Sequence, residues 1–220
     1  MSTASAAAPM AALPAFTSKV VPVVALTDAK QAAPLARALL AGGVDVIEIT
    51  LRHPCALAAI EAVAKEVPEM VLGAGTLLQA ADVQRVIDAG ARFGLSPGHT
   101  PALLAAVKAA GLPFVPGVMT PGEVMAARDQ GFKLLKLFPA AQAGGQKMLQ
   151  ALASPFGDVR FCPTGGVSED NFLSLLAERN VAMVGGSWLT PFADIEADRW
   201  DRITELARSA TRKMAEQAAA

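Results

Sequence analysis

The segment GFKLLKLFPA, residues 131–140, carries two lysines within an apolar run that ends in proline. Short segments of the same strand-like character, rich in β-branched residues, recur at 20–26, 44–50, 70–75, 92–96, 113–118, 133–138, 158–162 and 181–186. Alanine- and leucine-rich stretches with helical spacing separate them, at 30–40, 55–65, 80–89, 101–110, 121–130, 146–153, 170–178 and 200–213. This alternation predicts βαβ units and a parallel sheet.

The boundaries of these helical stretches support the alternation. Thr100 followed by Pro101 has the pattern of a helix N-cap with proline at the first helical position, and Gly111 stands where that helix should end. The repeated units, eight in all, predict an α/β fold: a compact (β/α)8 TIM barrel in a single domain. A doubly wound open sheet is the alternative, although no G-x-G-x-x-G dinucleotide fingerprint follows the first predicted strand.

The composition is that of a globular chain, with 53% hydrophobic residues among 220 and a near balance of 19 basic and 20 acidic residues. No basic run is dense enough to neutralise a row of phosphates or to hold an anionic membrane surface. We therefore expect neither a nucleic acid nor a membrane as a partner. Cys55 and Cys162 lie far apart and outside any CxxC spacing, which indicates neither a disulfide framework nor a zinc site.

We expect three parts along the chain. Residues 1–17 form an alanine-rich leader, for which we expect partial disorder or an extra N-terminal helix; residues 18–213 form the barrel; and residues 214–220 form a tail that frays from the last helix. The leader lacks the basic and leucine-rich regions of a signal peptide, and no later stretch approaches the roughly 20 apolar residues that span a bilayer. These features predict a cytoplasmic protein.

Polar residues collect where the predicted strands end, and in a (β/α)8 barrel these ends form the mouth at which active sites lie. In chain order the candidate residues are Glu48, Thr50, Arg52, Thr76, Ser96, Pro97, Lys136, Phe138, Thr164, Gly165, Gly166, Gly185, Gly186 and Ser187. Because side chains alternate along a strand, Lys136 and Phe138 share one face and Lys133 points to the other. The same parity predicts that Glu48 and Arg52 enter the interior beside Lys136.

The predicted interior lysine has a chemical use. Burial among apolar side chains and a nearby guanidinium both disfavour a charged ammonium, which frees the amine of Lys136 to attack a carbonyl and form a Schiff base. Glu48 can then move protons, and Arg52 can bind a substrate carboxylate. An internal salt-bridge network of the three charges is the alternative. No cluster of His, Asp, Glu or Cys has metal-ligand spacing at the mouth, so we expect no metal and no other cofactor.

Two glycine pairs near the end of the predicted barrel indicate a phosphate site. Loops after the seventh and eighth strands of such barrels commonly bind phosphate through backbone N–H groups and a helix N-terminus, and glycine permits the close approach. The segment TGG, 164–166, follows the seventh predicted strand, and GGS, 185–187, follows the eighth. Each pair alone would be an ordinary turn, but the paired placement predicts phosphate binding. Thr164 is placed to contact a substrate hydroxyl group.

Six blocks of sequence occur in order between about residues 20 and 212: VIEITLR at 46–52, GAGT at 73–76, SPG at 96–98, KLFPA at 136–140, RFCPTGG at 160–166 and GGSW at 185–188. A single block such as GAGT is weak support, whereas the ordered set is highly specific. In these blocks the chain resembles the family of 2-keto-3-deoxy-6-phosphogluconate (KDPG) and 2-keto-4-hydroxyglutarate (KHG) aldolases.

The resemblance implies a class I aldolase without a metal, usually a homotrimer. Such an enzyme is a carbon–carbon lyase of the Entner–Doudoroff pathway that reversibly splits KDPG into pyruvate and glyceraldehyde 3-phosphate. Many members also act on KHG. Carried over to this sequence, the resemblance implies an imine-forming lysine at Lys136, a general acid/base at Glu48, carboxylate binders at Arg52 and Thr76, and an apolar wall around the pyruvate methyl group at Pro97 and Phe138.

Other functions remain as alternatives. A sugar-phosphate isomerase or epimerase on the same barrel would share the phosphate loops, and a non-catalytic scaffold would share the fold, but neither needs an interior lysine beside an arginine. The sequence does not separate KDPG from its C4 epimer, which belongs to the galactonate series, so an aldolase specific for that epimer is a further alternative. His53 and His99 lie beside the blocks but outside their motif residues, and we expect both to be solvated loop residues.

Overall fold

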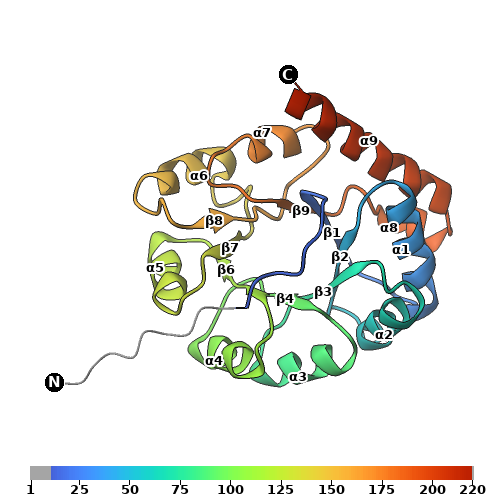
Figure 1. Cartoon of the computed structure of the whole chain (residues 1–220), viewed down its shortest axis with the longest axis horizontal. Coiled ribbons are helices and arrows are strands. Elements are labelled where there is room, and N and C mark those ends of the chain that lie inside the picture. Colours follow the sequence, from blue (N-terminus) through green and yellow to red (C-terminus); the bar gives the residue numbers. More distant parts are fainter. Residues whose placement is uncertain (1–10, 220) are drawn as a thin grey trace.

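The structure is a computed structural model that describes residues 11–219, and within this range short strands alternate with helices (Figure 1). The strands are β1 (Val20–Val24), β2 (Val46–Thr50), β3 (Val71–Gly75), β4 (Phe93–Leu95), β5 (Phe114–Val115), β6 (Gly117–Val118), β7 (Leu134–Leu137), β8 (Arg160–Phe161) and β9 (Val184–Gly186). The helices are η1 (Ala29–Gln31), α1 (Ala32–Ala41), α2 (Ala56–Glu66), α3 (Ala80–Asp88), α4 (Pro101–Ala110), α5 (Pro121–Asp129), α6 (Gly145–Ala153), α7 (Phe172–Leu176), α8 (Phe192–Glu196) and α9 (Trp200–Ala219). The predicted alternation is confirmed.

Local sequence explains the ends of several helices. α4 begins where the Thr100 side chain accepts a hydrogen bond of 3.2 Å from the backbone N–H of Leu103. α5 begins in the same way at Thr120, which accepts a hydrogen bond of 3.4 Å from the N–H of Glu123. α4 ends at Gly111, whose φ of 65° is a left-handed conformation that glycine adopts without steric cost. The predicted start and end of α4 are therefore confirmed.

All strand pairs in the described part of the chain are parallel. Six strands form one sheet in the order β5-β4-β3-β2-β1-β9, and three form a second in the order β6-β7-β8. Single bridges from Phe161 to Val181 and from Thr164 to Gly185 link the second sheet to the β9 side of the first. The predicted fifth strand is divided into β5 and β6 at Pro116, which has no N–H to donate to a ladder. The α/β class with a curled parallel sheet is confirmed, and Figure 1 shows the helices on the outer side of the strands.

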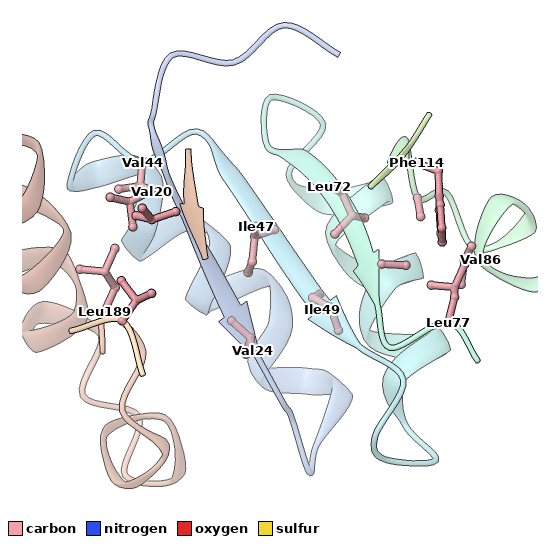
Figure 2. Packing of buried hydrophobic residues seen from close by; sticks show 14 of the residues in the cluster. Val20, Val24, Val44, Ile47, Ile49, Leu72, Leu77, Val86, Phe114 and Leu189 are labelled. Carbon is pink, nitrogen blue, oxygen red and sulfur yellow. The ribbon is translucent and has the colours of Figure 1, made fainter. Parts of the chain in front are cut away.

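Side chains of the strands alternate between two hydrophobic layers. Val20 and Val24 of β1 and Ile47 of β2 pack in the larger cluster, which includes helix residues (Figure 2). Val21 of β1 and Val46 of β2 instead join a smaller cluster that contains no helix residue and lies on the inner side of the curled sheet. Strands covered on both faces in this way read as continuous apolar runs. Polar residues that share the parity of Val46 must therefore face the inner side.

Residues 11–18 form an extended segment, blue in Figure 1, that runs across the inner side of the strands. Leu13 and Phe16 pack against the inner cluster, and the rings of Phe16 and Phe93 stack with centroids 6.3 Å apart. Asp45 accepts hydrogen bonds of 2.7 and 2.9 Å from two backbone N–H groups at the end of this segment. Part of the predicted leader is thus packed without forming a helix, and its first ten residues lie outside the described range.

The last helix, α9, packs beside α1, where the Thr204 hydroxyl donates a hydrogen bond of 2.9 Å to the carbonyl of Ala38. α9 continues through Ala219, so residues 214–219 are helical, and the fraying of this tail stays a prediction. Among the described helices, none is both long enough and apolar enough to cross a membrane.

Candidate active site

Lys136 and Glu48 form a buried ion pair on the inner side of the sheet. Lys136 lies in β7 and Glu48 in β2, and the lysine Nζ is 2.9 Å from Oε1 and 3.2 Å from Oε2 of the carboxylate. The two side chains are only 4% and 1% exposed. Taking two charges out of water is costly, and leaving one of them without its partner costs about 3–5 kcal/mol. The pair is therefore a candidate catalytic centre rather than a source of stability.

A glycine on the neighbouring strand leaves the space for this carboxylate. A Cβ atom at Gly75 of β3 would lie 2.0 Å from Glu48 Oε1, which is closer than side chains tolerate. Gly75 precedes Thr76, whose φ of 62° is unusual for a β-branched residue and costs about 1–3 kcal/mol. The sequence pointed to Thr76 as a site residue but not to Gly75, because the role of the glycine depends on a side chain from another strand.

Lys133 lies just before the first residue of β7, at the end of the strand opposite to the site. Its ammonium pairs with Asp158, and its side chain is 56% exposed. Lys136, three residues further on, is buried on the inner side. The prediction from strand parity, with Lys136 inside and Lys133 outside, is confirmed.

Phe138 and Cys162 lie beside the lysine. The Nζ atom of Lys136 is 5.6 Å from the centre of the Phe138 ring, a cation–π distance. Cys162 belongs to the inner cluster, and its burial raises the pKa of the thiol to about 12, an effect that the nearby Lys136 charge only partly offsets. The thiol is therefore neutral, and its Sγ lies 3.7 Å from the Oγ1 of Thr164. Lys136 thus has an aromatic ring and an uncharged thiol as neighbours.

Arg52 and Thr76 lie past the ends of β2 and β3 and contact each other. The Nε of Arg52 donates a hydrogen bond of 3.3 Å to the Oγ1 of Thr76. Arg52 is exposed, so the expectation that it enters the interior beside Lys136 is wrong, because strand alternation stops where β2 ends at Thr50. Within residues 11–219 no ion pair engages Arg52, and the guanidinium stands at the rim.

A cavity of about 350 Å³, a volume in the range of small-molecule sites, lies near the buried pair. Neither Lys136 nor Glu48 lines it, but Phe138, whose ring centre is 5.6 Å from Lys136 Nζ, does. The predicted site residues that line it are Arg52, Phe138, Thr164, Gly165, Gly166, Gly186 and Ser187. The sequence did not point to Val23, Ala25, Thr190 and Phe192, which also line it, because no motif marks them. Thr76 lines a second cavity of about 610 Å³, and Arg52 borders both.

The late glycines differ in what they do. Gly165 and Gly166 line the cavity with φ of 92° and 79°, values that a residue with a Cβ adopts only with strain. Gly186 lines it as well. Gly185 does not: it is buried, and a Cβ there would lie 2.4 Å from the Oγ1 of Thr164. Gly185 therefore makes room for Thr164 instead of facing the cavity.

Pro97 and His99 lie in the loop after β4, which packs on Gly117. A Cβ atom at Gly117 would lie 2.2 Å from the carbonyl carbon of Pro97, and the His99 Nδ1 is 2.8 Å from the Gly117 carbonyl oxygen. Gly117 is the register partner of Lys136, so this loop adjoins the strand that carries the lysine. His99 is a half-buried loop residue, so the expectation that it is solvated holds only in part, whereas His53 is exposed as expected.

The arrangement suits a small anionic carbonyl compound. An amine and a carboxylate lie in contact behind Phe138, which lines the cavity, and a guanidinium and glycine-rich backbone form other parts of the lining. Within residues 11–219, no group of three or more His, Cys, Asp or Glu side chains is arranged to hold a metal ion.

Residues 15–206 match the family model described as KDPG and KHG aldolase. The chain is 50% identical over 194 residues to the KHG/KDPG aldolase of Escherichia coli K12, which covers 88% of this chain and 91% of the relative. It is 48% identical over 191 residues to the 2-dehydro-3-deoxy-phosphogluconate aldolase of Dickeya dadantii, with 87% and 90% covered.

Solved structures agree with these sequence relationships. The KDPG aldolase of Legionella pneumophila, with pyruvate captured as a covalent carbinolamine intermediate, superposes with a TM-score of 0.86 at 43% identity, covering 88% of this chain and 94% of that one. The KDPG aldolase of Zymomonas mobilis ZM4 with 3-phosphoglycerate gives a TM-score of 0.82 at 42% identity, covering 88% and 90%.

Proposed function

Because the chain belongs to the KDPG and KHG aldolase family, we propose that it cleaves KDPG reversibly into pyruvate and glyceraldehyde 3-phosphate and that it also cleaves KHG. It is then a carbon–carbon lyase of class I, in which a lysine imine carries the reaction. The observation that carries this proposal is the 2.9 Å contact between Lys136 Nζ and Glu48 Oε1, close to Phe138 in the cavity wall. The carbinolamine of pyruvate in the Legionella protein supports the same chemistry here.

The reaction begins when Glu48 accepts a proton from the Lys136 ammonium. The neutral amine attacks the C2 carbonyl of the keto acid, and a C–N bond forms. Glu48 then gives its proton to the C2 hydroxyl group, which leaves as water, so that a protonated imine forms and Glu48 is a carboxylate again. The imine draws in the electron pair of the C3–C4 bond as it breaks, while Glu48 takes the C4 hydroxyl proton, so the aldehyde leaves and a neutral enamine remains. Glu48 then returns a proton to C3. Water finally hydrolyses the imine, which releases pyruvate and restores Lys136.

Arg52 and Thr76 bind the carboxylate at the pyruvate end of the substrate. The guanidinium has no carboxylate partner within residues 11–219, and its contact with Thr76 orients it at the cavity rim. Pro97 and Phe138 form an apolar wall around the pyruvate methyl group, in keeping with the position of Phe138 beside Lys136 and the packing of the Pro97 loop on the next strand.

The distal phosphate binds at the glycine-rich part of the cavity wall, away from the carboxylate-binding residues. The backbone N–H groups of Gly165, Gly166, Gly186 and Ser187 bind its oxygens, because the glycines leave the backbone open to a close approach. Thr164 contacts a substrate hydroxyl group from the same wall. Gly185 supports this arrangement indirectly by leaving room for the Thr164 side chain.

We also propose that the strands close into a (β/α)8 barrel that forms one domain over residues 18–213. The bridges from Phe161 to Val181 and from Thr164 to Gly185 support closure on one side, and the direct succession of β5 and β6 supports it on the other. No metal or other cofactor is needed, because the imine supplies the electron sink. We further propose that the protein is a cytoplasmic homotrimer. Sedimentation should give a mass in solution of three chains.

Reductive trapping tests the function directly. The protein is incubated with pyruvate and borohydride, and the modified peptide is identified by mass spectrometry. We expect a reduced pyruvyl adduct on Lys136, and KDPG should compete with its formation. An adduct on Lys133, or no adduct, would overturn the proposal.

A further inference from the structure

Phe192 projects from a helix that is otherwise held firmly. It is the first residue of the short helix α8, and 55% of its surface is exposed. In the same helix Ile195 is buried, its carbonyl accepts a hydrogen bond of 2.9 Å from Gln31, and Glu196 accepts one of 2.6 Å from the Thr27 hydroxyl. These contacts fix α8, and none of them involves the phenyl ring. The helix therefore fixes the position of the Phe192 backbone, while the ring stays largely exposed.

That place is the rim of the cavity. Phe192 lines it together with Val23, inside β1, and Ala25, just past the end of β1. Gly186 and Ser187 line it from the end of the adjacent strand, β9. Backbone amide groups and an apolar rim thus meet in one part of the cavity. A ligand that is anionic at its tip and hydrocarbon just behind it would satisfy both.

We propose that Phe192 is a specificity-determining residue that covers the carbon chain next to the distal phosphate of the bound substrate. This proposal rests on the proposed function, which places the phosphate at Gly166, Gly186 and Ser187. A ligand that covers an exposed aromatic ring removes apolar surface from water, which makes the free energy of binding more favourable. KDPG extends through C6 to the phosphate and reaches the ring. KHG ends with a carboxylate at C5 and leaves the ring in water.

The alternative is that the ring is an ordinary exposed side chain, and the chain offers a matched control for it. Met125 of α5 is 57% exposed, a close match to Phe192, but it does not line this cavity. Shortening either residue removes a similar exposed apolar side chain. Only the change at Phe192 should alter the choice between substrates.

The experiment compares the wild type with Phe192→Ala, Phe192→Leu and Met125→Ala, using kcat/KM for cleavage of KDPG and of KHG. We expect Phe192→Ala to lower kcat/KM on KDPG by about fivefold, mainly through KM, and on KHG by less than about twofold. Phe192→Leu should fall between Phe192→Ala and the wild type. Met125→Ala should match the wild type on both substrates. The borohydride adduct of pyruvate at Lys136 should form in every variant.

Several outcomes would overturn the inference. Equal losses on KDPG and KHG would mean that Phe192 supports the fold, and no loss on KDPG would mean that the ring does not reach the substrate. A change in sedimentation of Phe192→Ala that the Met125 variant lacks would assign the ring to a contact between subunits. If the wild type forms the pyruvate adduct but does not cleave KDPG, the assignment of the phosphate site is wrong. This result differs from the outcomes above, in which the wild type cleaves KDPG and only the role of Phe192 fails.

Discussion

Two lysines three residues apart on one segment differ in nearly every physical respect. Lys136 is enclosed on the inner side of the sheet with Glu48 as its ion-pair partner, whereas Lys133 lies in solvent near Asp158, which also holds Arg128 at 3.0 Å. Exposed pairs contribute little because water screens them, and a buried pair is costly to assemble. The same residue type is therefore solvated just before β7 and chemically useful within it.

Replacing each lysine tests this comparison most strongly. Lys136→Ala removes the imine-forming amine and should lower cleavage of KDPG by at least about 1,000-fold, while Lys133→Ala should keep it within about twofold. The measurement is steady-state release of pyruvate. Similar losses in the two variants would contradict the assignment of the nucleophile.

A folding control is needed for the first variant, because Lys136→Ala leaves Glu48 buried without a partner, at a cost of about 3–5 kcal/mol. Lys136→Arg keeps a positive charge but cannot form the imine. It should retain the circular dichroism spectrum of the wild type and remain inactive. Activity in Lys136→Arg would place the nucleophile elsewhere.

Replacing Glu48, the ion-pair partner of Lys136, should cause the next largest loss of activity. Glu48→Gln keeps the shape of the side chain but cannot exchange protons, so exchange of the pyruvate methyl protons into deuterated water should fall by about 100- to 10,000-fold. NMR of pyruvate in D2O follows this reaction without any aldehyde. A wild-type exchange rate would reduce Glu48 to a structural partner of the lysine.

A substitution at the proposed phosphate site should affect cleavage differently from a substitution in the Lys136–Glu48 pair. A Cβ at Gly166 would lie 2.4 Å from the Ala141 Cβ, and the residue has a left-handed φ, so Gly166→Val distorts this loop. Loss of hydrogen bonds to a charged phosphate should lower kcat/KM on KDPG by about 10- to 100-fold, with a much smaller loss on KHG. Equal losses on the two substrates would show that the loop shapes the fold and does not bind phosphate.

Asp158 and its two cationic partners, Arg128 and Lys133, should contribute only slightly to the stability of the protein in acid. Hydrogen bonds from Arg128 and then Lys133 lower the pKa of Asp158 from 3.8 to about 2. A carboxylate with a lowered pKa stabilises the folded protein above its unfolded pKa, and the contribution is lost as the pH falls through the folded value. Asp158→Asn should therefore show a small deficit in melting temperature above about pH 4 that disappears toward pH 2, with cleavage unchanged. A deficit that grows on acidification would contradict this sign.

Removal of metal should have no effect at all. Since the imine on Lys136 supplies the electron sink, cleavage of KDPG should survive prolonged dialysis against EDTA. The rate is compared before dialysis, after dialysis and after addition of Mg²⁺ or Zn²⁺. Activity that is lost on chelation and restored by a divalent ion would refute a Schiff-base mechanism.

The local patterns of the sequence were reliable guides to the elements. Alternating strand and helix segments, the Thr100 cap and the Gly111 end of α4 all depend on neighbours within a few residues, and the structure agrees with each. Strand parity also predicted the opposite orientations of Lys133 and Lys136. These properties follow from backbone geometry with a period of two or from a single turn of helix, so a short stretch contains all the information they need.

Contacts between distant segments were decided only by the tertiary structure. The Lys136–Glu48 contact joins residues 88 positions apart, and the space for it comes from Gly75 on a third strand. The exposure of Arg52 and the position of Phe192 on the cavity rim likewise appear only when strand ends and loops meet. By itself the sequence determined most of the elements, the opposite orientations of Lys133 and Lys136, and the family. Which side chains touch depends on how the strands pair and curl, because that arrangement brings together residues that no local pattern connects.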